Sequence, residues 1–300
     1  MPEKPQEQRW REIAVWRLSS WDGLIRDPSL KGFLALAKEC YQEQGLGVPL
    51  EEPPFSEEVL DALVTISWEA WKAQRDPFFK GIVLGLVGEQ THWVPPPFMN
   101  QGLVSPWMEL TGFIEKVPQD KLSDNARSLG LLFMVYHMLE GIIGPAWNMI
   151  TYHIKLYCGE QIKIEDCLFD KEKRWLLFSE SYNNLSNAIP LLKERPDYKR
   201  IEKGFRELLC STSRKKEIGH HHVSLVDLRN AIAHHDFIIQ DGEITLQWIY
   251  YGKKGKPGHH LIIPPHLLIQ DLLDWKKLVN ILVAWENTFH AFYSLSLAKH

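Results

Sequence analysis

The sequence predicts a mainly α-helical protein with a small β-hairpin inserted near its C-terminal end. Most apolar residues recur every three or four positions, which is the spacing of amphipathic helices. This spacing is sustained in two long stretches, residues 125–157 and 266–297. Apolar runs of strand length follow residue 236, where Asp241-Gly242 separates two of them. Because Asp-Gly between apolar runs favours a tight hairpin turn, we expect a hairpin there.

The composition is that of a soluble globular protein. Of 300 residues, 45% are hydrophobic and 24% are charged, which suits one large domain or two ordinary ones. The net charge of −4 excludes the strongly basic balance of a nucleic-acid coat protein, so any RNA contact must come from local patches. Twelve scattered tryptophans favour core or interface roles over a base-stacking platform. Four cysteines without a CxxC pair favour a reduced, intracellular protein.

The N-terminal part of the chain predicts a small helical bundle. Proline, glycine and N-cap signals divide its periodic stretches into four helices. They are expected at residues 7–19, 27–44, 56–75 (capped by Ser56) and 77–89. None carries a candidate site residue, so the role of this region is unknown.

Residues 91–120 predict a non-helical boundary between two domains. Pro95-Pro96-Pro97 and Asn100-Gln101-Gly102 interrupt the helical pattern. The segment also contains aromatic residues, which favour packing across a domain surface over a free linker: Trp93, Phe98, Trp107 and Phe113. We therefore expect a helical N-terminal region over residues 1–120 and a second helical domain over residues 121–300.

The second domain begins with a long helix from residue 125 to 157, for which Ser123 is a good N-cap. Its apolar core is interrupted by His137, Glu140 and Gly144-Pro145, which favours a buried helix over a membrane span. The charged N-terminus does not resemble a signal peptide, so we expect a cytoplasmic protein without a membrane association. Further elements follow in order: helices at residues 172–192 and 197–210, strands at 243–251 and 260–263, and a terminal helix at 266–297.

One short helix, within residues 223–237 (VSLVDLRNAIAHHDF), carries the chemical signal of the chain. Ser224 is a suitable N-cap, and the helix is expected to end near His235. Asn230 and His234 are four positions apart and therefore share a helical face, with Arg229 beside them. The segment presents an arginine, an amide and an imidazole close to the end of one helix.

This arrangement resembles the HEPN superfamily, whose ribonuclease members carry an arginine, a polar residue and a histidine a few positions later. The match here is Arg229, Asn230 and His234, with His235 as an alternative histidine. The bare spacing is not specific, because Arg214 with His220 or His221 also satisfies it. The capped amphipathic helix and the helical segment beyond it favour Arg229. The resemblance covers the last third to half of the chain and implies an up-and-down helical bundle.

The resemblance implies cleavage of single-stranded RNA without a metal or other cofactor. RNA supplies its own nucleophile, the 2′-hydroxyl, and an imidazole can transfer protons at neutral pH. His234 is then the acid/base, Arg229 stabilises charge on the phosphate, and Asn230 orients the imidazole or binds the phosphate. Because one helix offers only half of such a site, the resemblance also implies a homodimer across the motif helix. A toxin or antiviral-defence effector with a regulatory protein partner is the biological role it suggests.

Two basic loops flank the motif helix and are candidates for binding the RNA backbone. They contain Lys215 and Lys216 before the helix and Lys253 and Lys254 after it, and His235 is a further candidate contact. Ordinary solvated loops are the alternative for each.

No metal site is expected, although His220-His221-His222 and His259-His260 concentrate five histidines. Adjacent histidines do not converge easily on one ion, and the cysteines are remote. A second function class stays open. Many HEPN proteins are non-catalytic, so the chain could instead be a HEPN-like module that binds RNA, a nucleotide or a protein.

Overall fold

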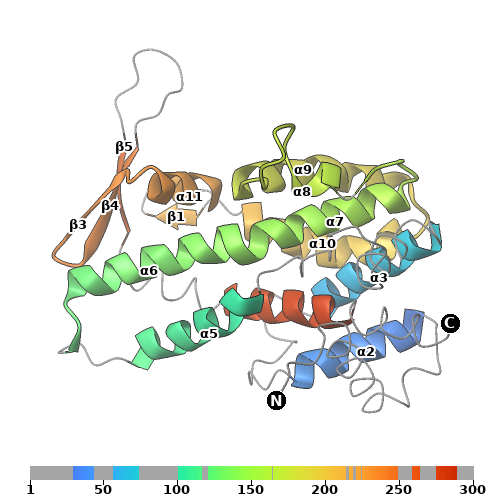
Figure 1. The fold of residues 1–300 in the computed structure, drawn as a ribbon, viewed down its shortest axis with the longest axis horizontal. Helices are drawn as coiled ribbons and strands as arrows, with labels where there is room; N and C mark the ends of the chain where they lie inside the picture. The colour runs from blue at the N-terminus through green and yellow to red at the C-terminus, as the bar shows by residue number, and fades with distance from the viewer. Residues whose placement is uncertain are drawn as a thin grey trace, which may run out of the picture.

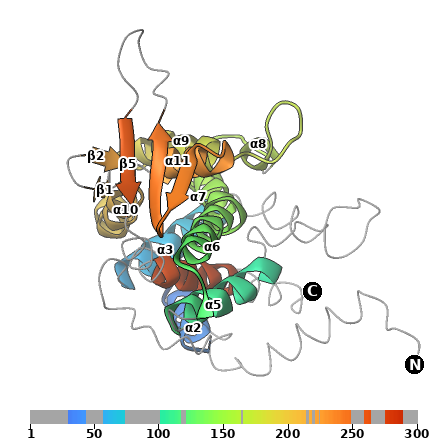
Figure 2. The same ribbon diagram turned by 90° about the vertical axis from the view of Figure 1, so that its left-hand side faces the viewer.

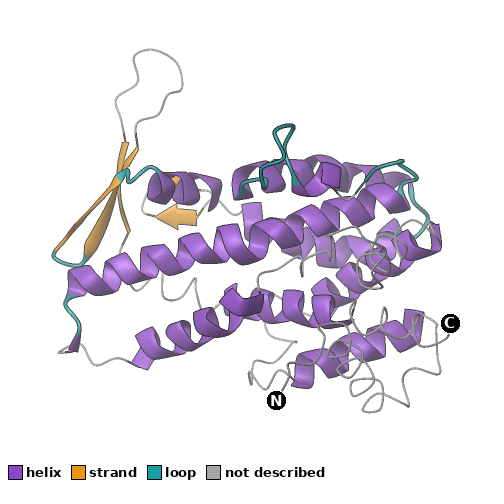
Figure 3. Ribbon diagram, in the orientation of Figure 1, coloured by secondary structure: helices purple, strands orange, loops and turns teal. Residues whose placement is uncertain are grey.

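The computed structural model describes residues 30–43, 57–73, 101–116, 121–163, 165–213, 216–218, 221–223, 225–248, 259–263 and 275–288. Helices make up most of this part of the chain, and the strands gather at one end of the molecule (Figures 1 and 3). The predicted mainly α class is therefore confirmed. The helices expected at residues 7–19 and 77–89 lie outside the described residues, as do Ser56 and Ser224.

A single long helical rod forms the axis of the molecule (Figure 1). It consists of α6 (Asp124–Met138), the π-helical turn η2 (Leu139–Ile143) and α7 (Gly144–Tyr157). Ser123 caps it as predicted, because its Oγ accepts a hydrogen bond from the backbone N–H of Ala126 at 3.3 Å. The rod is long and apolar enough to cross a membrane by composition, yet 56% of its most apolar window is buried inside the protein. It is placed like the core helix of a soluble protein.

The π-helical turn has a local cause in Pro145. A proline inside an α-helix lacks the N–H for the bond to the residue four positions earlier, and its ring collides with that residue's carbonyl. The wider turn accommodates it, with the Gly144 N–H donating to the Leu139 carbonyl five residues back. Glycine at position 144 suits this turn, because a Cβ there would lie only 3.1 Å from the Leu139 carbonyl oxygen and in contact, at 3.4 Å, with the Cα of Phe178. The turn thus brings the rod close to the next helix, α9.

Helices from both ends of the sequence pack around this rod. The helix α3 (Glu57–Ala73) lies against α7 and α10 (Tyr198–Ser213), and α2 (Leu30–Glu43) packs on α3. A Cβ at Gly204 of α10 would lie 2.1 Å from the Glu58 carbonyl oxygen, so glycine permits this close crossing. The boundary between two domains at residue 120 stays a prediction. One hydrophobic core runs from α2 and α3 to α7 and to the helix over residues 275–288.

A buried polar cluster fixes three of these helices relative to one another. The Ser67 hydroxyl donates to the Leu63 carbonyl at 3.0 Å and accepts from Trp285 Nε1 at 2.8 Å. His153 Nδ1 lies 2.9 Å from the same oxygen. Because the Ser67 hydroxyl donates its proton to Leu63, its oxygen acts as the acceptor towards His153, which donates through Nδ1–H. Burial lowers the pKa of His153 to about 3.

The expectation of a non-helical segment over residues 91–120 is wrong for residues 101–116, which form α5 (Gln101–Lys116). Pro106 lies inside this helix and costs about 3 kcal/mol. Burial of Val104, Trp107 and Met108 offsets that cost at roughly 2 kcal/mol each. Trp107 packs against α6 and donates its indole N–H to the Met134 carbonyl at 3.0 Å. Tertiary packing therefore overrides the local helix-breaking signals.

The helix expected at residues 172–192 begins later and ends as a 3₁₀ turn. The elements here are α8 (Glu165–Leu168), α9 (Phe178–Ala188) and η3 (Ile189–Glu194). Between α8 and α9 the chain makes a tight turn closed by an antiparallel bridge between Phe169 and Trp175. Asp170 stabilises that turn by accepting backbone N–H groups, which explains why the helix does not start at residue 172.

The predicted hairpin is confirmed. Strands β3 (Phe237–Gln240), β4 (Glu243–Trp248) and β5 (His259–Ile263) form an antiparallel sheet in that order. Asp241 and Gly242 have φ of 51° and 80°, as a type I′ turn requires. The turn docks on the start of α6, where the Gly242 N–H donates to Asn125 Oδ1 at 2.7 Å and the Gly242 carbonyl accepts from Ser128 Oγ. Figure 2 shows this sheet beside α11 and the start of α6.

A second small sheet was not expected from the sequence. It pairs β1 (Lys216–Ile218) with β2 (His221–Val223), directly before the motif helix. The short histidine-rich run therefore includes a strand.

Candidate functional site

The motif helix is α11 (Leu225–Ala233), which lies against α6, α9 and β4. Leu225, Leu228 and Ile232 are buried at helical spacing and hold it on the rod. The small residue Ala231 is buried beside them. The apolar face predicted from the sequence is confirmed.

The helix ends in a Schellman motif formed by His235 and Asp236. The His235 N–H donates to the Ile232 carbonyl at 3.2 Å, and the Asp236 N–H donates to the Ala231 carbonyl at 2.8 Å. His235 has φ of 55°, a left-handed conformation that usually selects glycine or asparagine. Both His234 and His235 are exposed. The helix therefore ends near His235, as predicted, and the chain turns away there.

Arg229 is the buried member of the motif, with 5% of its surface exposed. Its Nε donates a hydrogen bond to Glu140 Oε1, and its Nη1 donates to Asn230 Oδ1 at 3.0 Å. The guanidinium carbon lies 5.9 Å from the centre of the Tyr136 ring. Arg229 is thus held by one carboxylate, one amide and one aromatic ring, all within this chain.

Glu140 links the motif helix to α9. Its Oε1 binds Arg229, and its Oε2 accepts the backbone N–H of Phe178 at 3.1 Å. Phe178 is the first residue of α9, where N–H groups lack partners and a negative charge is favourable. Because both carboxylate oxygens are used, this partly buried charge is well compensated.

Part of the guanidinium remains available. Of the five N–H donors of an arginine, one on Nε and one on Nη1 are engaged, which leaves three without a partner among the described residues. No nitrogen of Arg229 is both fully buried and unpaired. A phosphate oxygen could accept from the unused Nη2 donors only at the small part of the side chain, 6%, that is exposed.

The other candidate residues have different positions. Asn230 is half-buried, and its side chain pairs with Arg229. The backbone N–H of His234 donates to the Asn230 carbonyl at 3.0 Å. The three motif residues therefore lie together near the C-terminal end of one helix. Lys216 lies in β1, opposite Val223. Lys215, Lys253 and Lys254 lie outside the described residues.

The sequence reasoning missed two residues of this site, Glu140 and Tyr136. In the sequence, Glu140 stands out only as an interruption of the apolar span. A carboxylate inside an otherwise buried helix needs a partner, and that requirement was the available signal. Its partner is 89 positions away in the sequence, so no local pattern could name Arg229.

Among the described residues, no three His, Cys, Asp or Glu side chains are grouped so that they could hold a metal ion. Comparisons of the chain with protein-family models, with curated proteins and with solved structures found no match. The assignment of a function therefore depends on the site itself.

Proposed function

We propose that this protein is a metal-independent endoribonuclease of the HEPN type that cleaves single-stranded RNA through the 2′-hydroxyl. The observation that carries the proposal is the helix end that combines a positioned guanidinium with an exposed imidazole. Glu140 and Asn230 orient Arg229, and His234 lies one turn after Asn230 at the surface. A cytoplasmic toxin or defence effector is the role we assign to this activity.

In the proposed reaction, one imidazole removes the proton from the 2′-hydroxyl, and the oxygen attacks the adjacent phosphorus. The O2′–P bond forms as the P–O5′ bond breaks, and a second imidazole donates a proton to the departing 5′-oxygen. The products are a 2′,3′-cyclic phosphate and a 5′-hydroxyl. The unused N–H donors of Arg229 stabilise the charge on the phosphate oxygens in the transition state.

The need for two imidazoles favours a homodimer. Each chain places one His234 at the end of α11, so a two-fold axis beside that helix end would bring two copies together. The same symmetry would supply two guanidinium groups to one phosphate.

The test is cleavage of a mixed-sequence RNA in excess EDTA by the wild type, His234→Ala and His137→Ala. His137 is an exposed histidine of α6 outside the motif and serves as the matched control. We expect the wild type and His137→Ala to leave 2′,3′-cyclic phosphate ends and His234→Ala to be inactive. Equal cleavage by folded His234→Ala would remove His234 from the mechanism.

Arg229 requires a different substitution, because its removal leaves Glu140 unpaired in a partly buried position. Arg229→Lys retains the charge but loses the planar set of donors. We expect this variant to fold and to cleave at least about 10-fold more slowly than the wild type.

A second candidate is a non-catalytic HEPN-like module that binds RNA, a nucleotide or a protein. The burial of Arg229 and its ion pair with Glu140 favour this candidate, since both suit a structural arginine. Binding of the same RNA without cleavage, equal in wild type and His234→Ala, would support it.

A further inference from the structure

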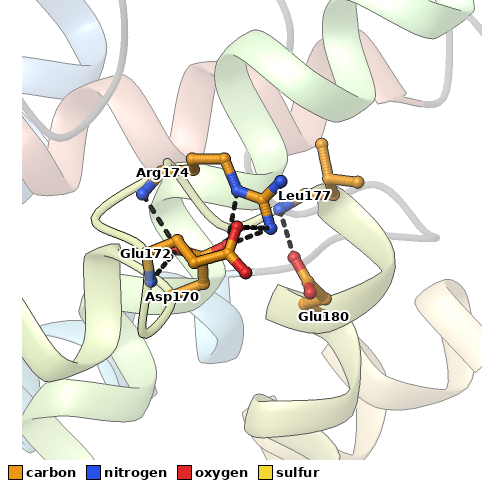
Figure 4. A network of polar contacts seen from close by, with 5 residues as sticks. All are labelled: Asp170, Glu172, Arg174, Leu177 and Glu180. Carbon is orange, nitrogen blue, oxygen red and sulfur yellow. Dashed lines mark hydrogen bonds and ion pairs between the residues drawn. The ribbon is translucent and has the colours of Figure 1, made fainter.

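The tight turn between α8 and α9, residues 169–175, is ordered by a polar network centred on Asp170 (Figure 4). Its carboxylate accepts the backbone N–H groups of Glu172 at 2.8 Å and of Arg174 at 2.9 Å. The Arg174 side chain returns to Asp170 through Nε at 2.8 Å and to Glu172 through Nη2 at 2.8 Å. The backbone N–H of Arg174 is the main cause that lowers the pKa of Asp170. The turn is therefore pre-ordered at neutral pH.

This turn exposes an aromatic ring. Trp175 packs one side against Phe169, with ring centres 4.6 Å apart, and 50% of its surface remains exposed. A large indole on a rigid turn, half open to solvent, is a common feature of binding surfaces. The sequence favoured core roles for the tryptophans, and Trp175 is an exception.

Two cations on the turn are not neutralised. Arg174 is paired with both acidic residues, Asp170 and Glu172. Lys171 and Lys173 are exposed and have no ion pair among the described residues. Lys173 also has φ of 60°, where glycine or asparagine would be less strained.

The turn is close to the candidate site. Trp175 is three residues before Phe178, so their Cα atoms are at most about 11 Å apart. The Phe178 N–H donates to Glu140, the residue that holds Arg229. Glu180 fixes the connection by accepting the Leu177 N–H at 2.9 Å (Figure 4). A short single strand at Arg229 could therefore also reach the indole.

We propose that the turn of residues 169–175 is a second contact for single-stranded RNA, with Trp175 stacking on an unpaired base and Lys171 and Lys173 contacting phosphates. This inference rests on the proposed function and specifies how its substrate is held. Exposed aromatic rings flanked by cations are the usual platform for unpaired strands, whereas bases inside a duplex have no free face for stacking. The pre-ordered turn reduces the entropy lost on binding.

The first test is the affinity of a fluorescently labelled mixed-sequence RNA 12-mer, measured by anisotropy in a His234→Ala background so that the RNA stays intact. Trp175→Ala should weaken binding roughly 5- to 100-fold, as expected for the loss of one stacked base. Trp175→Phe should retain most of the affinity. Leu177→Ala removes a neighbouring side chain that is 47% exposed, and it should have no effect.

The second test uses Lys173→Gly, which removes the charge and also relieves the left-handed backbone. Its melting temperature should be equal to or above that of the parent, while its RNA affinity falls and the salt dependence of binding decreases by about 0.7 in log–log slope. Lys121→Ala, an exposed lysine before α6, is the charge control. A loss of affinity without a loss of stability would separate a binding role from a structural one.

The outcomes distinguish the two proposals. If the wild type cleaves RNA but Trp175→Ala and Lys173→Gly bind it like the parent, the second contact is overturned and the ribonuclease stands. The indole would then belong to a protein interface. If RNA is neither bound nor cleaved, both proposals fail together.

Discussion

Arg229 and Glu140 form an ion pair across 89 positions of sequence and connect the motif helix to the π-helical turn of the central rod. The same carboxylate accepts the first N–H of α9. Three elements thus meet at one partly buried charge. Removal of the Glu140 carboxylate would therefore take away a hydrogen-bond partner of the guanidinium that we assign to the phosphate.

This pair predicts a strong effect on stability. Arg229→Ala should lower the free energy of unfolding by roughly 3 kcal/mol, because it leaves Glu140 charged without its partner. The double variant Arg229→Ala/Glu140→Gln should recover part of that loss, since a neutral amide costs less to leave unpaired. Urea unfolding of the wild type, the two single variants and the double variant would measure the coupling. Additive losses would mean that the pair contributes nothing specific.

The end of the motif helix predicts a stabilising substitution. His235→Gly should raise the free energy of unfolding by about 0.5–1 kcal/mol, because glycine adopts φ of 55° without steric cost. His234→Gly should lower it by a similar amount, since His234 does not have a positive φ. Thermal unfolding of both variants is the measurement. If His235 binds RNA, His235→Gly will be more stable but will bind RNA more weakly.

The buried imidazole predicts an acid-sensitive core. Burial holds the pKa of His153 at about 3, whereas an unfolded chain has the ordinary value of 6.5. Above pH 6.5 both states are neutral and there is no effect. As the pH falls from 6.5 towards 3, only the unfolded chain takes up the proton, so stability declines, by about 2 kcal/mol at pH 5.

The corresponding variant is His153→Phe, which cannot take up a proton. Its stability at pH 7 should be lower, because Ser67 loses a partner, but its decline between pH 7 and 5 should be smaller than that of the wild type. Urea titrations at several pH values give both quantities. Parallel curves for the two proteins would assign the acid sensitivity to other groups.

The docking of the hairpin predicts that Gly242 is not replaceable. Gly242→Ala introduces a Cβ 2.8 Å from that of Asp124 at a residue with φ of 80°. The strain and the shift of the turn away from Asn125 should cost at least about 2 kcal/mol. Thermal unfolding tests this, with Gly112→Ala as the control because no atom lies within 4 Å of a Cβ there. Similar stability of both variants would contradict the docking.

Features that depend on a few neighbouring residues could be predicted from the sequence. The Ser123 cap, the type I′ turn at Asp241-Gly242 and the apolar face of α11 follow from local hydrogen bonding, backbone preference and spacing. The motif residues Arg229, Asn230 and His234 could be named for the same reason, because one helix turn brings them together.

Features that depend on distant partners were decided by the tertiary structure. α5 is helical around Pro106 because α6 buries Trp107. The partner of Arg229 is Glu140 because the π-helical turn and α9 place that carboxylate beside the motif helix. The sequence alone determined the helical class, the hairpin and the motif. Which motif side chain is buried and which is exposed was decided by packing, because burial depends on the total surroundings of a residue and not on its neighbours in the chain.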